Sequence, residues 1–378
     1  MAIVEAGLGA AKDATNALDA SALELGVVTS IGPEHVNALG GSLESIAKAK
    51  AAVFKEGKLG VMAEQEYGVA EAVVLMEASE RKVKTYRVEA VVDYHVEDGR
   101  ACLKETPWGV TVKSDVSFEV PGELIDACFG GPEASATGVS DAWKFDASLS
   151  LVGKHQASNA ATAITSALAL RIDGAYDRIS MASIQTGLEK AWLPGRFQVV
   201  DDVNLDGMHE VNAGIVTAED PDSGIAEPEE ARKRVLTIVD GAHTKASARC
   251  VADTVRLLFP DSKLAVVMAM ASDKDHEGFC SEIQKTRPNV VVFTETPIAG
   301  GQARSAGPGA LAGAWRTAKM KDRSMDRTWR CRELIQANVQ SALAKARHEL
   351  SGEASVKDAP GIILVCGSLS VYDSCAKM

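Results

Sequence analysis

The sequence has little that would mark a membrane protein, a secreted protein or a nucleic-acid-binding protein. No apolar run among the 378 residues approaches the roughly 18 to 20 residues that a bilayer-spanning helix needs. The first nine residues have neither the basic flank nor the apolar core of a secretory leader. The formal net charge of −12 argues against a polyanion such as nucleic acid as a partner. The composition predicts a soluble globular protein, and an acidic surface does not exclude anionic small substrates.

Paired cysteines are also absent. The seven cysteines are scattered, odd in number and never arranged as C-x-x-C, so neither a disulfide framework nor a zinc site is predicted. This usage is typical of a reducing compartment.

The sequence contains no phosphate-binding loop of the form G-x-x-x-x-G-K-[ST], in which backbone amides and a lysine hold nucleotide phosphates. The nearest stretch is Gly153-Lys154, but His155 follows it and Ser148 stands where the first glycine belongs. Gly7-Leu8-Gly9 lacks the third glycine of a dinucleotide fingerprint, so an ordinary turn is favoured there.

What is present is an alternation of short apolar runs with helical patterns, which is typical of α/β proteins. In the first half we expect strands at 27–31, 59–63 and 147–151, helices at 42–54, 67–76 and 155–170, and a β-rich insertion at about 83–120. Ala2-Ile3-Val4 followed by Glu5 is predicted to be the edge of a buried strand. A chain that opens inside a strand is expected to have lost a portion upstream.

The second half repeats this pattern and predicts a second domain. Strands are expected at 235–240, 264–268, 289–293 and 362–366, separated by helices, as in a Rossmann-like domain. We divide the chain into a domain at 1–195, a linker with an acidic insertion at 196–234, and a domain at 235–378. A loop is expected at 130–141 and a mobile excursion at 299–327.

Six stretches in a fixed order resemble a known family. They are Glu5-Ala6-Gly7-Leu8-Gly9 with Asp13-Ala14-Thr15-Asn16, Thr29-Ser30-Ile31-Gly32-Pro33-Glu34-His35 with the stretch to Lys55, His155-Gln156-x-x-Asn159-Ala160, Leu193-Pro194-Gly195-Arg196, Asp240-Gly241-Ala242-His243, and Gly367-Ser368-Leu369. The family is the folylpolyglutamate synthase/dihydrofolate synthase branch of the Mur ligases, and residues 240–276 are most similar to its plant-type dihydrofolate synthases. Ala10, Ala11 and Glu34 depart from the family pattern.

The resemblance implies a Mur-ligase-like α/β fold, with an incomplete central nucleotide-binding domain followed by a Rossmann-like C-terminal domain. The phosphate loop that the family carries in its N-terminal portion is absent here. The implied activity is ATP-dependent addition of L-glutamate to dihydropteroate through an acyl phosphate, with Mg²⁺. The implied protein is a mitochondrial or cytoplasmic monomer without membrane or nucleic-acid partners.

Three residues match the family's metal site: Glu5, His35 and Lys50. From the residues alone, Glu5 is better explained as a capping or surface-paired carboxylate and His35 as a structural histidine. Lys50 is one of four lysines on or after one helix, with Lys48, Lys55 and Lys58, where a solvated face is the ordinary explanation. By resemblance Lys50 is catalytic and can be carbamylated, which turns the amine into a metal ligand.

Four residues match the family's nucleotide contacts: Asn159, Arg196, Asp240 and His243, the last also as a catalytic residue. Helix capping explains Asn159 equally well, and solvated turns explain the other three. Two alternative functions remain open. The protein extends folates with further γ-linked glutamates, or it is a truncated homologue without ATP turnover.

Overall fold

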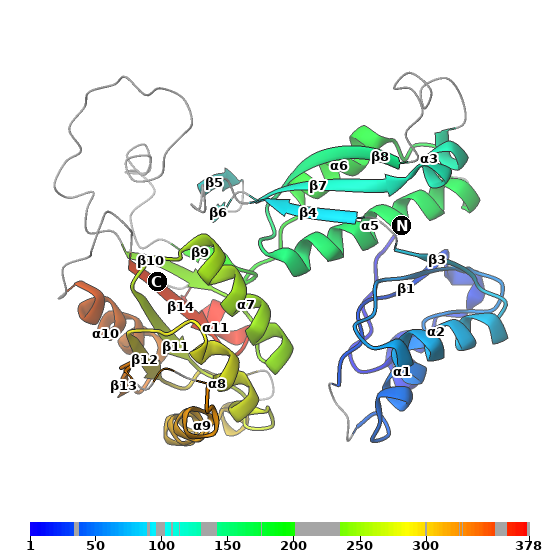
Figure 1. Ribbon diagram of the computed structural model, residues 1–378. Helices are drawn as coiled ribbons and strands as arrows, with labels where there is room; N and C mark the ends of the chain where they lie inside the picture. Colours follow the sequence, from blue (N-terminus) through cyan, green and yellow to red (C-terminus); the bar gives the residue numbers. More distant parts are fainter. Residues whose placement is uncertain are drawn as a thin grey trace, which may run out of the picture. The chain divides into compact units, whose positions relative to one another are not determined.

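The computed structural model describes residues 1–33, 38–88, 91–95, 103–106, 109–112, 114–129, 142–174, 176–200, 235–298, 301–324, 326, 328–351 and 361–375. Their contacts divide into two compact units (Figure 1). The first unit comprises Met1–His95, Asp115–Leu149 and His155–Lys190, and the second comprises Val96–Ser114, Ser150–Lys154 and Ala191–Met378. The acidic insertion at 201–234 and the loop at 130–141 lie outside the described residues, so the domain boundaries stay a prediction.

A parallel sheet of three strands opens the first unit, in the order β1 (Leu25–Val28), β2 (Leu59–Met62) and β3 (Lys84–Arg87). Helices α1 (Leu43–Ala51) and α2 (Gly68–Glu80) pack on it through Ile46 and Val74, and Phe54, which follows α1, lies in the same core. Ser42 caps α1, because its hydroxyl accepts a hydrogen bond from the Ser45 amide at 3.2 Å.

The expected strand at Ala2–Val4 is wrong. Residues 1–6 have no regular structure, Ile3 is 98% exposed, and Glu5 lies in this exposed segment rather than at a strand end. A strand needs a neighbour to bond its amides, and no described strand pairs with this segment. Three short 3₁₀ helices follow it: η1 (Ala10–Lys12), η2 (Ala14–Ala17) and η3 (Ala20–Ala22).

A second sheet in the first unit has the order β4 (Val91–His95), β7 (Ser114–Pro121) and β8 (Ala142–Leu149). It packs with α3 (Gly122–Phe129), α5 (Lys154–Asp173) and α6 (Met181–Lys190) through residues such as Phe118, Ile164 and Leu168. Within the stretch predicted to be β-rich, at about 83–120, β5 (Leu103–Thr106) and β6 (Gly109–Val112) form an antiparallel pair. This pair belongs to the second unit, whereas β3 belongs to the parallel sheet.

The second unit is built on a six-stranded sheet in the order β13-β12-β11-β14-β10-β9. The four predicted strands are confirmed as β10 (Val235–Val239), β11 (Leu264–Met268), β12 (Val290–Phe293) and β14 (Gly361–Cys366), and they are parallel. The edge strands β9 (Gln198–Val200), antiparallel to β10, and β13 (Arg332–Ile335), parallel to β12, were not predicted.

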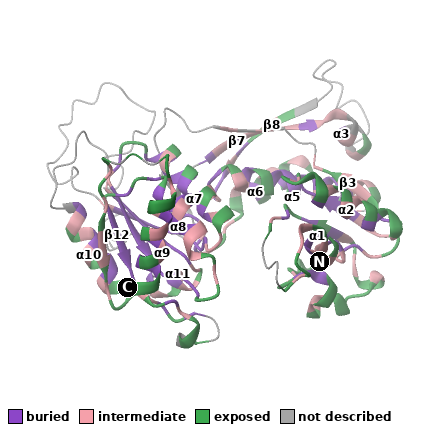
Figure 2. Cartoon of the chain, turned by 60° about the horizontal axis from the view of Figure 1, so that its bottom comes forward, coloured by how far each residue is buried: buried purple, intermediate pink, exposed green. Residues whose placement is uncertain are grey.

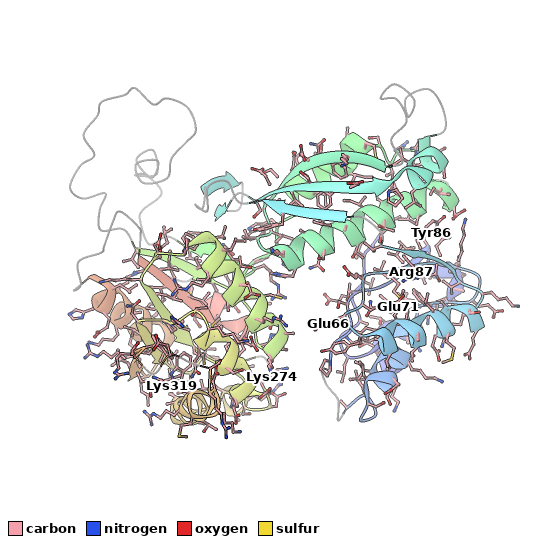
Figure 3. The ribbon with its side chains drawn as sticks, viewed as in Figure 1. Glu66, Glu71, Tyr86, Arg87, Lys274 and Lys319 are labelled. Atoms are coloured by element: carbon pink, nitrogen blue, oxygen red, sulfur yellow. The ribbon has the colours of Figure 1, made fainter. Side chains whose placement is uncertain are left out.

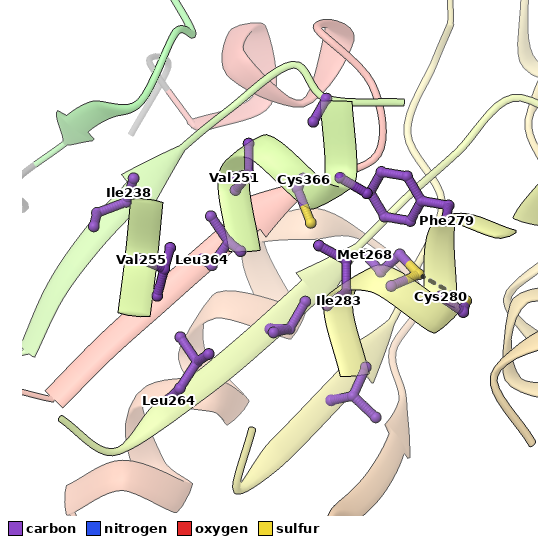
Figure 4. Close-up of a cluster of buried hydrophobic side chains, with 14 of the residues drawn as sticks. Ile238, Val251, Val255, Leu264, Met268, Phe279, Cys280, Ile283, Leu364 and Cys366 are labelled. Atoms are coloured by element: carbon purple, nitrogen blue, oxygen red, sulfur yellow. Dashed lines mark hydrogen bonds between the residues drawn. The ribbon is translucent and has the colours of Figure 1, made fainter. Parts of the chain in front are cut away.

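Helices cover both faces of this sheet, as in doubly wound proteins. One face packs on α7 (Lys245–Leu258), α8 (His276–Gln284) and α9 (Pro308–Lys321), and the other on α10 (Val339–Ser351) and α11 (Ser370–Cys375). Alternate residues of β11 serve the two cores: Leu264, Val266 and Met268 lie in the first, shown in part in Figure 4, and Ala265 and Val267 in the second. Figure 2 shows the central strands of this sheet, such as β12, as buried.

The mobile excursion expected at 299–327 is also wrong. This stretch contains the 3₁₀ helix η7 (Gln302–Arg304) and the 14-residue helix α9. Leu311 and Trp315 of α9 are fully buried, and the Trp315 ring meets Phe293 edge-on with centroids 6.0 Å apart. The many Gly, Ala, Arg and Lys residues hid an apolar stripe at helical spacing. Among the described helices, none is long and apolar enough to cross a membrane.

Candidate functional site

The topology of the second unit creates a switch point between two neighbouring strands. The chain leaves β10 for α7 on one face of the sheet and leaves β14 for α11 on the other face. Because β10 and β14 pair in parallel, their following loops diverge at the carboxyl edge, where open α/β sheets bind ligands. The two loops are joined where the Gly367 amide donates to the Ala242 carbonyl at 2.8 Å.

Arg196 reaches this edge from a turn with an unusual backbone. Gly195 and Phe197 both have left-handed φ values, 66° and 47°, on either side of Arg196. The Gly241 amide donates to the Gly195 carbonyl at 2.8 Å, which ties this turn to the loop after β10. A Cβ added at Gly241 would lie 2.8 Å from Arg196 Nη1, so the guanidinium lies directly against that glycine.

Asp240 joins the two turns. Its Oδ2 accepts a hydrogen bond from the Phe197 amide and its Oδ1 accepts one from the Ala242 amide, both at 2.8 Å. Burial raises the pKa of Asp240, and the two amide hydrogen bonds together with the charges of Arg196 and His243 oppose that rise. In this arrangement the carboxylate organises the backbone around Arg196.

His243 is held at the start of α7. Its Nδ1 lies 2.9 Å from the Gly241 carbonyl oxygen, so Nδ1 carries the proton and donates to it. Nε2 is therefore the ring atom left for a ligand. The helix begins with a capping box between Thr244 and Ser247, and the Ser247 hydroxyl also accepts the His243 amide at 3.1 Å.

In the first unit, Asp13 holds the loop that follows Glu5. One of its oxygens accepts hydrogen bonds from the Gly7 and Leu8 amides at 2.9 and 3.1 Å, and the other accepts two from Thr15 at 3.0 and 2.8 Å. Thr15 first, and then Leu8 and Gly7, lower the pKa of Asp13 to about 2. A Cβ added at Gly9 would lie 3.4 Å from the Cβ of Ala49, so this loop lies against α1.

The lysines of α1 differ in their surroundings. Lys48 pairs with the buried carboxylate of Glu77 at 3.3 Å, and Lys55 donates to Asn16 at 2.5 Å. Their explanation as a merely solvated face is therefore incomplete. Lys50 is half-buried in the last turn of α1.

Asn159 is exposed on α5, where its amide donates to Gln156 at 3.1 Å. Elsewhere in this unit Asp173, at the end of α5, pairs with Lys84 of β3 at 2.7 Å. Arg87 of β3 pairs with Glu71 of α2 (Figure 3). These ion pairs join the elements around β3.

The structure therefore brings together Arg196, Asp240 and His243 within one unit, while Glu5, Lys50 and Asn159 belong to the other. His35 lies outside the described residues. Among those that are described, no group of three His, Cys, Asp or Glu side chains is placed to hold a metal ion.

Two residues of the site were missed from the sequence. Gln198 accepts the Gly195 amide at 3.0 Å, and Ser247 fixes the backbone of His243. The only signal for Ser247 was its place three residues after Thr244, since a capping box is usually recognised by Glu or Gln there. Gln198 carries no sequence signal of its own.

An open, mostly parallel sheet with polar residues gathered at its switch point is typical of ligand-binding α/β proteins. The chain belongs to the Mur ligase family: residues 1–167 match the Mur ligase middle domain, and residues 227–369 match the Mur ligase glutamate ligase domain. This confirms the fold and family that the motifs predicted.

The similar proteins come from the branch that the motifs indicated. The dihydrofolate synthase/folylpolyglutamate synthase of Bacillus subtilis is 26% identical over 282 residues, which are 75% of this chain and 50% of that protein. The chain thus spans about half the length of this curated relative.

Solved structures show the same fold. Folylpolyglutamate synthase of Mycobacterium tuberculosis, complexed with ADP and AMPPCP, superposes with a TM-score of 0.64 at 21% identity over 98% of this chain and 66% of that one. E. coli FolC in complex with DHPP and ADP superposes with a TM-score of 0.61 at 22% identity, over 98% of this chain and 64% of that one.

Proposed function

We propose that the protein uses ATP to join L-glutamate to dihydropteroate and so makes dihydrofolate. The observation that carries this proposal is the convergence of Arg196, Asp240 and His243 on Gly241, at the switch point of a unit that matches a glutamate ligase domain. The relatives support it through their names, and E. coli FolC through its bound DHPP and ADP.

The reaction has two steps. The γ-phosphoryl group of ATP passes to the carboxylate of dihydropteroate, which forms an acyl phosphate and releases ADP. The amino group of glutamate then attacks the acyl carbon, so that an amide bond forms and phosphate leaves with the electron pair of the broken C–O bond.

Charge on the phosphoryl oxygens is what this site can stabilise. A guanidinium presents paired donors that match phosphate oxygens, and we assign that contact to Arg196. Asp240 holds the turn that carries Arg196 and lines the nucleotide site. With Nδ1 donating to Gly241, Nε2 is the ring atom of His243 that is left for the reacting groups. Asn159 is assigned to the nucleotide by resemblance.

Glu5, His35 and Lys50 are proposed as the Mg²⁺ site, with Lys50 carbamylated. The support is the family match, since the described residues form no cluster of ligands. Binding of Mn²⁺ to the wild-type chain and to Glu5→Gln tests this assignment, and mass spectrometry of the peptide with Lys50 tests the added carboxyl group. Equal Mn²⁺ binding by both proteins removes Glu5 from the site. A monomeric state and a mitochondrial or cytoplasmic location remain predictions.

The activity is tested by ATP-dependent phosphate release with dihydropteroate and glutamate, using Arg196→Ala as the control. Dihydrofolate formation that Arg196→Ala abolishes is the expected result. If the chain instead extends tetrahydrofolate and ignores dihydropteroate, the assigned acceptor is wrong and the folylpolyglutamate activity replaces it.

One observation favours a second candidate, a homologue that binds nucleotide without turning it over. The sequence lacks the glycine-rich phosphate loop, and phosphoryl transfer depends on positioning and electrostatics from such groups. AMPPNP binding without phosphate release under any substrate combination identifies this second candidate.

A further inference from the structure

We propose that Gln198 is a positioning residue that fixes Arg196 for contact with nucleotide phosphates. The proposal rests on the proposed function and adds a residue to the same site. Gln198 is the first residue of β9, is only 8% exposed, and accepts the Gly195 amide through Oε1 at 3.0 Å. Its partner across the sheet is Val239, the residue directly before Asp240.

The turn that Gln198 closes is strained. Phe197 has φ 47°, which is a rare conformation for a bulky side chain and is retained only where the surroundings enforce it. The Phe197 ring is buried in the core under α7, and its amide is held by Asp240 at 2.8 Å. On the other side of Arg196, the amide of Gly195 is held by Gln198.

Arg196 therefore lies between two residues with left-handed backbone conformations, and the amides of both residues donate to buried side chains. A buried amide side chain is costly unless it is hydrogen-bonded, and a leucine would fill this strand position without that cost. The bond to Gly195 is thus the reason we give for an amide at this position. Without that acceptor, the Gly195 amide loses its partner, only the bond from the Gly241 amide still holds Gly195, and the guanidinium is less firmly placed against Gly241.

A double-mutant cycle separates this role from a general loss of stability. Binding of AMPPNP with Mg²⁺ is measured for wild type, Gln198→Leu, Arg196→Ala and the double variant. We expect Gln198→Leu to weaken binding about tenfold in the wild-type background and less than about twofold when Arg196 is already alanine. An equal loss in both backgrounds, or no loss in either, overturns the proposal.

The matched control is Gln284→Leu, which removes another buried amide of the same unit, bonded to the Trp315 carbonyl at 2.7 Å. This variant should lower the melting temperature and leave AMPPNP affinity unchanged. Amide exchange at Gly195 gives a second readout, because Gln198→Leu should speed it at least about tenfold. An unchanged exchange rate at Gly195 would show that Gln198 does not hold this amide.

A failure of the proposed function has a different signature. A wild-type chain that binds no AMPPNP, or an Arg196→Ala variant that binds as tightly as wild type, contradicts the proposed nucleotide site. Either result also contradicts the claim that Gln198 places Arg196 for contact with nucleotide phosphates. The exchange rate of Gly195 still decides whether Gln198 holds the turn.

Discussion

Gly241 is the residue around which the other site residues are arranged. Arg196 Nη1, Leu369 Cδ1 and the Leu369 Cα would lie 2.8, 2.9 and 3.2 Å from a Cβ at this position. The first two atoms belong to side chains that can move, but the third is backbone. The absence of a side chain at Gly241 therefore allows the Pro-Gly-Arg turn and the loop after β14 to approach the end of β10.

Replacing Gly241 with alanine should displace both neighbours. We expect a loss of stability of about 1–3 kcal/mol from overpacking and weaker AMPPNP binding, because Arg196 must leave its place. Thermal unfolding and calorimetric titration measure the two effects. Gly313→Ala in α9 is the matched control, since a Cβ there meets nothing within 4 Å. That change should be neutral or stabilising, and a Gly241→Ala variant that behaves like it would contradict the crowded geometry.

Asp13 supports a prediction on pH. Hydrogen bonds from Thr15, Leu8 and Gly7 lower the pKa of this carboxyl from 3.8 to about 2. Because the folded-state pKa is depressed, the stabilisation that the carboxylate gives is present above about pH 4 and is lost as the pH falls toward 2.

The amide proton shifts of Gly7 and Leu8 should therefore titrate with a midpoint well below 3.8. In Asp13→Asn the same shifts should not titrate in this range. A wild-type midpoint at the ordinary carboxyl value would mean that Asp13 does not hold the loop.

Among the elements, the buried strands were predictable and the edges were not. Leu264–Met268 was predicted to the residue, because a strand buried on both faces is a continuous apolar run. β13, with the sequence Arg-Glu-Leu-Ile, lies at an edge of the sheet and pairs Arg332 with Glu349, so its polarity concealed it. The apolar run at Ala2–Val4 misled in the opposite direction, because an apolar stretch without a neighbouring strand forms no ladder.

The capping box of α7 makes a prediction at the same scale. Ser247 accepts amides of His243 and Thr244 at 3.1 and 3.0 Å, so Ser247→Ala should cost about 1 kcal/mol of stability. The same change loosens the backbone of His243 and should increase its amide exchange.

Ser281→Ala in α8 is the control, because that hydroxyl only bonds back to the Gly278 carbonyl at 2.8 Å within its own helix. Chemical denaturation compares the two variants. Equal stabilities would show that the capping box contributes little.

For the whole molecule, the two units have separate cores. The clusters around Ile46 and Phe118 belong to the first unit, and those around Trp315 and Leu343 belong to the second. The resemblance of the motifs to the family predicted that Arg196, Asp240 and His243 serve one ligand. The hydrogen bonds of Asp240 to Phe197 and Ala242 depend on the approach of two distant segments, and no spacing in the sequence reveals such contacts.

Separate cores should unfold separately. Differential scanning calorimetry is expected to resolve two transitions. AMPPNP should raise the melting temperature of the transition in which the second unit unfolds and Trp315 becomes exposed. Tryptophan fluorescence of a Trp143→Phe variant, which leaves no tryptophan in the first unit, identifies that transition. A single transition shifted as a whole by AMPPNP would show that the units unfold as one.

Gly367, at the end of β14, has a consequence for the genetics of this protein. Its φ is 109°, and a Cβ there would lie 2.4 Å from the Ala269 carbonyl oxygen and 2.7 Å from Met270 Cγ. Every missense change of a glycine codon introduces a Cβ, whichever amino acid results. In a saturation screen for function this codon should therefore tolerate synonymous changes alone, even though its residue contributes no side chain to the site.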